Sequence, residues 1–225
     1  SDISRKDRRQ PQLSLTLADA GASAPFTTRN VTVRIDVSQA PAGAQDVRLF
    51  RNGSLVKVWR GDVLKKQSSV TLGATIPIVA GENRLTVYAF NHDNIKSNDL
   101  TLVVKGADSL KRQGTAHILA VGVNRYSNPG YNLKYAVADA EGFSAEIKRQ
   151  QELLKNYAQL EIISVSDATA TKANIMEKLA QLVERAQPED TVVVYFAGHG
   201  MAMENRFYLI PHDLGYAGPR ARLNE

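Results

Sequence analysis

The period of the hydrophobic residues changes near residue 106, and this change limits the folds that are open to the chain. Between residues 13 and 105, apolar and polar residues alternate in short runs separated by turn-forming residues. After residue 114 the apolar residues form continuous runs, joined by segments with helical spacing. Alternation is typical of antiparallel strands that bury one face, whereas continuous runs are typical of strands covered on both faces. The sequence therefore predicts two domains of different classes.

The first region, residues 13–105, is predicted to be all-β. Its runs with period two are 13–19, 30–38, 45–59, 69–78, 83–91 and 99–105. Asn52 and Gly53 favour a type I′ turn, so the third of these runs predicts a hairpin. Six or seven strands in about 90 residues are typical of an immunoglobulin-like β-sandwich. The chain has no Cys, so this sandwich would be held together by packing alone. Trp59 falls in period with its apolar neighbours, which favours a structural role.

Two polar segments flank this region. Residues 1–12 form a basic tail, and residues 106–114 form a linker with glycine at both ends. The net charge of +5 would suit an anionic partner, but the tail has no interleaved aromatic residues, so we expect no binding of nucleic acid. No apolar run approaches the roughly 20 residues that span a bilayer, and no apolar stretch follows the basic tail. We therefore expect no membrane segment and a cytoplasmic location.

The second region, residues 115–225, is predicted to be α/β. Its continuous apolar runs are 116–124, 160–166 and 191–197, and the segments between them have helical spacing. Alternating strands and helices are typical of a mostly parallel sheet covered on both faces, which is a three-layer arrangement. Thr171 is the expected N-cap of the second helix, and Pro188 follows its end. Active groups of such sheets collect beyond the carboxyl ends of the strands.

His199 lies at such an end, directly after "TVVVYFA" and between Gly198 and Gly200. Glycine allows the backbone to turn sharply and a substrate backbone to approach closely. Gly200 also leaves its amide unshielded, as the donor of an oxyanion hole must be. A turn with an incidental histidine is the simplest alternative, but the strand end and the two glycines together favour a catalytic role.

Other chemistries lack the residues that they require. The chain contains neither a G-x-S-x-G elbow nor a phosphate-binding G-x-x-x-x-G-K-[ST] loop. The histidines are scattered along the sequence, so we expect no metal site; they are His92, His117, His199 and His212. His117 falls inside an apolar run, which favours a structural role.

Four motifs in order resemble the first half of a caspase-like catalytic domain, nearest the bacterial members and metacaspases. They are "HILAVGVNRY", "LKYAVADAEGF", "VVVYFAGHG" and "FYLIPHD", and together they cover roughly residues 115–215. The resemblance implies that residues 115–225 are the large-subunit part of this domain, incomplete at its C-terminus. It also implies that His199 is the general base of a Cys–His dyad and that Gly200 contributes to the oxyanion hole. In caspases the nucleophilic Cys follows the histidine by about 50 residues, so here it would lie downstream of Glu225.

The resemblance has further implications for specificity. Caspases that cut after Asp have an Arg where this chain has Leu133, so a preference for Asp is not expected. Asp139 aligns with an acidic residue that metacaspases associate with a basic residue before the cut. An Asp in a first helical turn also complements the helix dipole, and both interpretations stay open. For an enzyme that cuts after basic residues, Arg220 and Arg222 are candidate self-processing sites.

The expected function is a cysteine endopeptidase, regulated as related bacterial proteins are in antiviral defence or cell death. Its expected partners are a protein or peptide substrate, the C-terminal remainder that carries the Cys, and a sensor domain or protein upstream. The chemistry requires no cofactor, although the resemblance leaves room for activation by calcium. Residues 1–225 alone are expected to be inactive. The alternative is a catalytically inactive caspase-like scaffold or binding module.

Overall fold

The computed structural model describes residues 6–18, 25–203, 206–214, 216–217 and 220–221. The chain divides into two compact units, Ser1–Arg112 and Gln113–Glu225. The division falls within the segment 106–114, where the period of the hydrophobic residues changes. No helix among the described residues is long and apolar enough to cross a membrane.

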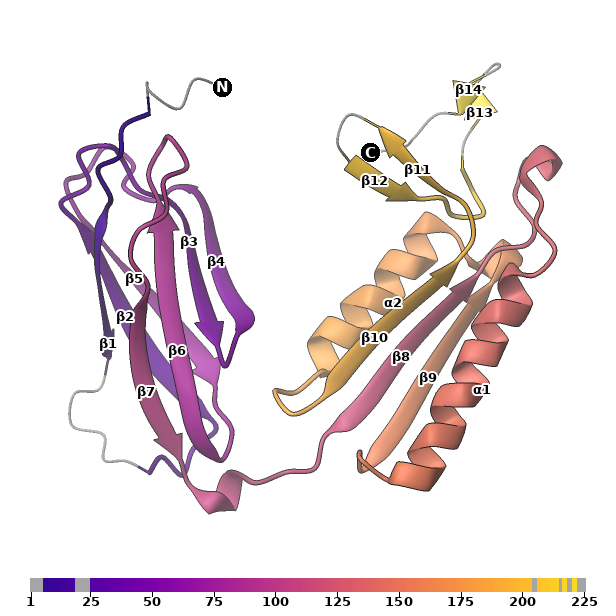
Figure 1. The fold of residues 1–225 in the computed structure, drawn as a ribbon, viewed down its shortest axis with the longest axis horizontal. Coiled ribbons are helices and arrows are strands. Elements are labelled where there is room, and N and C mark those ends of the chain that lie inside the picture. Colours follow the sequence, from indigo (N-terminus) through magenta and orange to yellow (C-terminus); the bar gives the residue numbers. More distant parts are fainter. Residues whose placement is uncertain (1–5, 19–24, 204–205, 215, 218–219, 222–225) are drawn as a thin grey trace. The chain divides into compact units, whose positions relative to one another are not determined.

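The first unit is built of antiparallel strands, as the alternating pattern predicts (Figure 1). The strands are β1 (Gln12–Leu17), β2 (Asn30–Ser38), β3 (Gln45–Arg51), β4 (Ser54–Asp62), β5 (Val70–Pro77), β6 (Gly81–Phe90) and β7 (Leu100–Gly106). They form one sheet in the order β1-β2-β5 and a second in the order β4-β3-β6-β7. The hairpin between β3 and β4 turns at Asn52 and Gly53, whose φ angles of 48° and 84° suit the predicted type I′ turn.

One hydrophobic core joins the two sheets of the first unit. Along β2, the inward residues Val33, Ile35 and Val37 are fully buried while their neighbours face outward. They belong to the same cluster as Leu49 of β3 and Val87 of β6, which lie in the other sheet. The period of two therefore gives each sheet one apolar face, and the two faces pack together. After β7, a short 3-10 helix η2 (Asp108–Leu110) adds to this core.

The second unit contains a parallel sheet in the order β10-β8-β9 (Figure 1). Its strands and helices are β8 (Thr115–Gly122), α1 (Ala136–Leu154), β9 (Gln159–Ser166), α2 (Lys172–Arg185) and β10 (Thr191–Ala197). Phe143 of α1 stacks on Tyr195, with ring centroids 4.3 Å apart, whereas Leu182 of α2 packs in one cluster with Phe196. Because neighbouring residues of a strand point to opposite faces, the helices cover opposite faces of the sheet. The predicted three-layer arrangement is confirmed for these elements.

The strands at the two edges of this sheet are less buried than the sequence predicts. Every residue of the central strand β8 is buried. Val192 and Val194 of β10 are instead 44% and 48% exposed. Among the described strands β10 pairs with β8 alone, so it lies at an edge, where one neighbour is missing. A continuous apolar run does not distinguish an edge strand from a central one.

Short elements complete the second unit. They are the 3-10 helices η3 (Pro129–Tyr131) and η4 (Asp167–Thr169) and the strands β11 (Gly200–Met203), β12 (Arg206–Leu209), β13 (Tyr216–Ala217) and β14 (Arg220–Ala221). β11 and β12 form a hairpin that follows β10 directly (Figure 1). Thr171 caps α2 as predicted, because its Oγ1 accepts the N–H of Asn174 at 3.2 Å.

Candidate active site

His199 lies beyond the carboxyl end of the parallel sheet, as its sequence position indicates. The strand β10 ends at Ala197, whose carbonyl accepts the N–H of Val123 at 2.9 Å, just after β8. Gly198 and His199 then connect β10 to β11, and the carbonyl of His199 accepts the N–H of Ile210 at 2.9 Å. The histidine is therefore held between the sheet and the β11–β12 hairpin, at the edge where active groups of such folds collect.

Two tyrosines of the loop after β8 surround His199. The N–H of His199 donates to Tyr126 Oη at 2.8 Å, and its ring Nε2 lies 2.9 Å from the carbonyl oxygen of Tyr131. The imidazole centroid is 5.2 Å from the ring of Tyr126 and 5.9 Å from that of Tyr131. A carbonyl can only accept, so this contact places the proton of a neutral imidazole on Nε2. Nδ1 then carries the lone pair, and it has no hydrogen-bond partner in the described part of the chain.

The loop that carries these tyrosines is itself fixed by side-chain carbonyl and carboxylate groups. Asp167 Oδ1 accepts the N–H groups of Asn124 at 2.8 Å and of Arg125 at 2.9 Å. Asn132 Oδ1 accepts the N–H of Tyr126 at 2.9 Å. The main chain of the loop thus has several anchors, and the carbonyl that orients the imidazole is held in place. Sequence reasoning missed this support, because a tyrosine or asparagine in a loop carries no signal of its distant partner.

Burial raises the pKa of the Tyr126 phenol, and the hydrogen bond from the His199 amide offsets part of this effect. The phenol of Tyr126 therefore stays neutral near pH 7, where its oxygen accepts the His199 amide without bringing a negative charge beside the imidazole.

The glycines on either side of His199 fill different roles. At Gly198 a Cβ would lie 2.9 Å from Tyr126 Oη and 2.9 Å from the ring of Phe196, so a side chain there would displace one of these groups. Gly200 pairs with Leu209 in the hairpin, and the neighbouring pair, His199 with Ile210, is joined by a hydrogen bond. Since bonded and non-bonded pairs alternate in an antiparallel ladder, the amide of Gly200 points away from β12. It is thus oriented to donate outward.

The remaining candidates of the sequence analysis belong to other segments of the second unit. Asp139 is exposed in the first turn of α1, and within the described residues its carboxylate makes no contact with His199. Leu133 is partly buried and packs against the cluster beside the sheet. Arg220 lies in the two-residue strand β14, and Arg222 lies outside the described residues.

The other two histidines of the second unit, His117 and His212, make contacts that hold the structure together. His117 is 4% exposed and contacts Glu161 and Asp190, which confirms its structural role. His212 Nδ1 lies 2.7 Å from the carbonyl oxygen of Arg125 and helps to hold the loop. No group of three or more His, Asp and Glu side chains in the described ranges could hold a metal ion.

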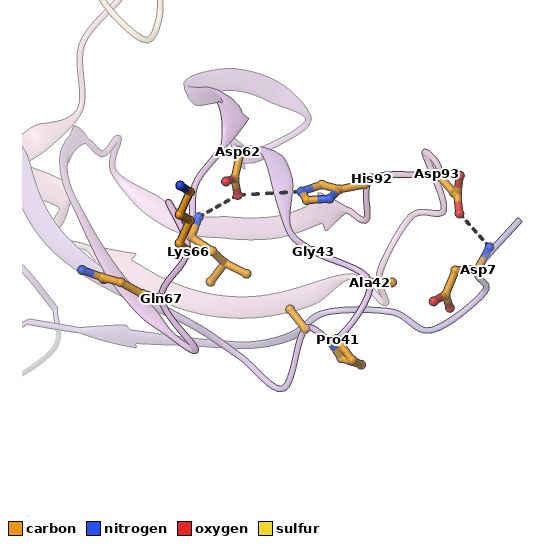
Figure 2. Close-up of a pocket in the computed structure, with 11 residues that line it drawn as sticks. Asp7, Pro41, Ala42, Gly43, Asp62, Lys66, Gln67, His92 and Asp93 are labelled. Atoms are coloured by element: carbon orange, nitrogen blue, oxygen red, sulfur yellow. Dashed lines mark hydrogen bonds and ion pairs between the residues drawn. The ribbon is translucent and has the colours of Figure 1, made fainter.

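The first unit has a pocket of its own, drawn in Figure 2. It has a volume of about 460 Å³ and is lined by residues from the loops at one end of the sheets and from the segment before β1. His92 Nε2 lies 3.8 Å from Asp62 Oδ1, and Asp93 accepts the N–H of Asp7 at 2.7 Å (Figure 2). Its carboxylates are thus engaged by groups of the same unit, and the pocket offers no constellation for catalysis.

Comparison with solved structures gives distant likenesses. The fibronectin(III)-like modules of Clostridium thermocellum CbhA align with 16% identity over 42% of this chain and 99% of that chain, with a TM-score of 0.29. A polysaccharide deacetylase from Bacillus cereus aligns with 13% identity over 83% of this chain and 60% of that chain, with a TM-score of 0.26. Likenesses with TM-scores this low do not establish a common fold.

Comparison with curated proteins gives no match. A family model does match the second unit. Residues 117–210 match the family described as metacaspase, peptidase C14 domain. The matched range contains His199, Gly200 and Asp139, and it ends before Arg220. The match therefore supports a caspase-like cysteine peptidase family for this part of the chain.

Proposed function

We propose that this chain contributes the histidine of a Cys–His dyad to a cysteine endopeptidase of the caspase or metacaspase type. The observation that carries the proposal is the state of the His199 ring, in which Nε2 is fixed on the Tyr131 carbonyl and Nδ1 is open. An imidazole held in this way can take a proton from a thiol at Nδ1 and later give it to a leaving amine.

The proposed reaction cleaves a peptide bond in two steps. Nδ1 of His199 accepts the thiol proton, and the thiolate attacks the carbonyl carbon, whose developing negative charge is stabilised by the outward amide of Gly200. The imidazolium then protonates the leaving amine as the C–N bond breaks, which leaves a thioester. Water, deprotonated by the same imidazole, hydrolyses the thioester and restores the thiol.

The nucleophile must come from outside residues 1–225, because the chain has no Cys. We place it in a segment downstream of Glu225 that adds a strand to the sheet beside β10. Two observations on β10 support this placement. Val192 and Val194 are exposed, and the described strands pair with only one edge of β10. An apolar edge strand left open is a template for pairing, and proteins ordinarily cover it.

For specificity we propose a preference for Arg or Lys before the scissile bond. Leu133 cannot pair with an acidic substrate side chain, whereas Asp139 is exposed and could pair with a basic one. Arg220 and Arg222 are then proposed as self-processing sites.

We propose that the first unit is an immunoglobulin-like sandwich that connects the peptidase to an upstream sensor, in a regulated bacterial protease of defence or cell death. The strand orders β1-β2-β5 and β4-β3-β6-β7 around one core support the sandwich. Because the chain has no Cys, a second candidate function stays open. It is an inactive caspase-like scaffold whose first unit binds a partner.

Reconstitution tests the dyad. Residues 1–225 and the segment encoded after them are expressed separately, then assayed alone and mixed with fluorogenic peptides. We expect hydrolysis from the mixture, abolished by thiol alkylation, and none from residues 1–225. Activity of residues 1–225 alone that resists alkylation would contradict the dyad. An inactive mixture whose downstream segment contains no Cys would favour the scaffold.

A further inference from the structure

Tyr126 touches both the backbone and the ring of the candidate general base. Tyr126 is 5% exposed, and its Oη accepts the N–H of His199 at 2.8 Å. Its ring centroid lies 5.2 Å from the imidazole centroid, with the planes tilted by 47°. Its own N–H is held by Asn132 Oδ1, so the position of the phenol is set from the loop side.

This contact leaves little room for rearrangement. A Cβ at Gly198 would lie 2.9 Å from the Tyr126 hydroxyl, so the backbone that precedes His199 packs directly against the oxygen. Five residues further along the same loop, Tyr131 supplies the carbonyl that receives Nε2. One loop therefore holds the histidine at two points, the amide through Tyr126 and the ring through Tyr131. If the His199 amide were released from Tyr126, the backbone of His199 could shift. The imidazole would then no longer be held with Nε2 at the Tyr131 carbonyl.

We propose that Tyr126 is a positioning residue for His199, whose hydroxyl holds the imidazole with the proton on Nε2 and the lone pair on Nδ1. The positioning stands on the contacts alone, and its consequence for catalysis rests on the proposed function.

The test is ¹⁵N NMR of the ring nitrogens of His199 in residues 1–225, assigned by comparison with a His199→Gln variant. We expect the wild-type protein to hold the Nε2–H form and Tyr126→Phe to raise the share of the Nδ1–H form about fivefold, the effect of losing one hydrogen bond. Tyr157→Phe is the matched control, because it removes another hydroxyl bond of 2.8 Å, to Thr191 Oγ1 at the other end of the sheet. It should leave the His199 tautomer unchanged.

A second variant guards against failure of Tyr126→Phe to fold. Gly198→Ala keeps the phenol but crowds both its oxygen and the ring of Phe196, so hydrogen exchange of the His199 amide shows whether the bond to Tyr126 is lost; where it is lost, the same change of tautomer should follow. An unchanged tautomer in folded Tyr126→Phe or in Gly198→Ala with the amide bond lost, or the same change in Tyr157→Phe, overturns the proposal.

A kinetic assay of the reconstituted peptidase distinguishes a failure of this proposal from a failure of the proposed function. There Tyr126→Phe should lower kcat about tenfold with KM unchanged, because the base is misplaced and the substrate contacts are kept. A wild-type mixture without activity would contradict the peptidase, while the NMR comparison would still decide the role of Tyr126.

Discussion

Two histidines lie at opposite ends of the parallel sheet in the second unit, and different groups face their ring nitrogens. His117 is near the start of β8, with Nδ1 3.2 Å from Glu161 Oε2 and Nε2 3.2 Å from Asp190 Oδ2. His199 follows the end of β10, with Nε2 on the carbonyl of Tyr131 and Nδ1 without a hydrogen-bond partner among the described residues. The side chain of His117 is 5% exposed, whereas His199 is partly exposed.

The difference shows what separates a structural histidine from a candidate base. Both nitrogens of His117 are engaged by carboxylates, and Glu161 also pairs with Arg185 at 3.2 Å. Both ring nitrogens are thus occupied by groups of the protein, and this network ties together the starts of the three strands. At the other end one nitrogen is fixed and the other is open, which is the arrangement that proton transfer needs. One end of the sheet therefore carries a structural network, and the other end carries the candidate base.

The largest expected effect is that of His199→Ala on catalysis. In the reconstituted peptidase we expect kcat/KM to fall at least ~10⁴-fold, as for a base that acts as a unit with its nucleophile. The free energy of unfolding of the second unit should fall by about 1 kcal/mol or less, because one hydrogen bond is lost. Peptide hydrolysis measures the first quantity and urea unfolding the second. His92→Ala, in the first unit, is the control, and near-normal turnover of His199→Ala would refute the assignment.

His117→Ala should do the opposite. It leaves Asp190, whose side chain is 1% exposed, without its imidazole contact but with the backbone N–H groups of Thr115 and Gln187, so the expected loss is about 1–3 kcal/mol. Circular dichroism at 222 nm follows the second unit, since both described α-helices belong to it. Fluorescence of Trp59, the single tryptophan, follows the first unit and should be unchanged. A loss below about 1 kcal/mol in the helical signal would mean that the network does not stabilise the sheet.

Much of this fold could be predicted from the sequence because its signals are local. The alternation of apolar and polar residues predicted the strands of the first unit. Asn52 and Gly53 predicted a turn, and Thr171 predicted the start of a helix. His199 and its glycines were also visible, since the strand end is a local feature. The partial exposure of β10 could not be predicted, because a continuous apolar run is compatible with both an edge strand and a central strand.

The support of the site was hidden for a different reason. Tyr126 and His199 are 73 residues apart, and their contact exists only once β8 and β10 pair in register. Asp167 reaches Asn124 across 43 residues through the same sheet. Contacts of this kind depend on topology, so a single sequence without its fold does not reveal them.

Asp139→Asn should have a smaller effect, confined to specificity. If Asp139 pairs with a basic substrate residue, its loss should reduce the preference for Arg over Leu before the scissile bond about tenfold or more, as the loss of a charged hydrogen bond does. A peptide library measures the preference. Glu141→Gln is the matched control, because Glu141 is an exposed acid two residues further along α1 and faces another direction. If Asp139→Asn leaves the preference intact, Asp139 serves the helix dipole alone.

The smallest expected effect concerns Thr171, which lies at the same end of the sheet as His199 but serves structure. Thr171 caps α2 directly after Ala170, whose carbonyl accepts the N–H of His212 at 2.8 Å. Thr171→Ala removes the acceptor of the Asn174 amide and should lower the free energy of unfolding of the second unit by about 1 kcal/mol. Thr171→Ser keeps the hydroxyl and should recover most of this loss. Both are measured by urea unfolding at 222 nm, with peptide hydrolysis of the mixture as the second readout. Thr171→Ala should lower the stability of the second unit and leave the rate of peptide hydrolysis unchanged. A tenfold loss of rate would show that Thr171 also supports the site around His199.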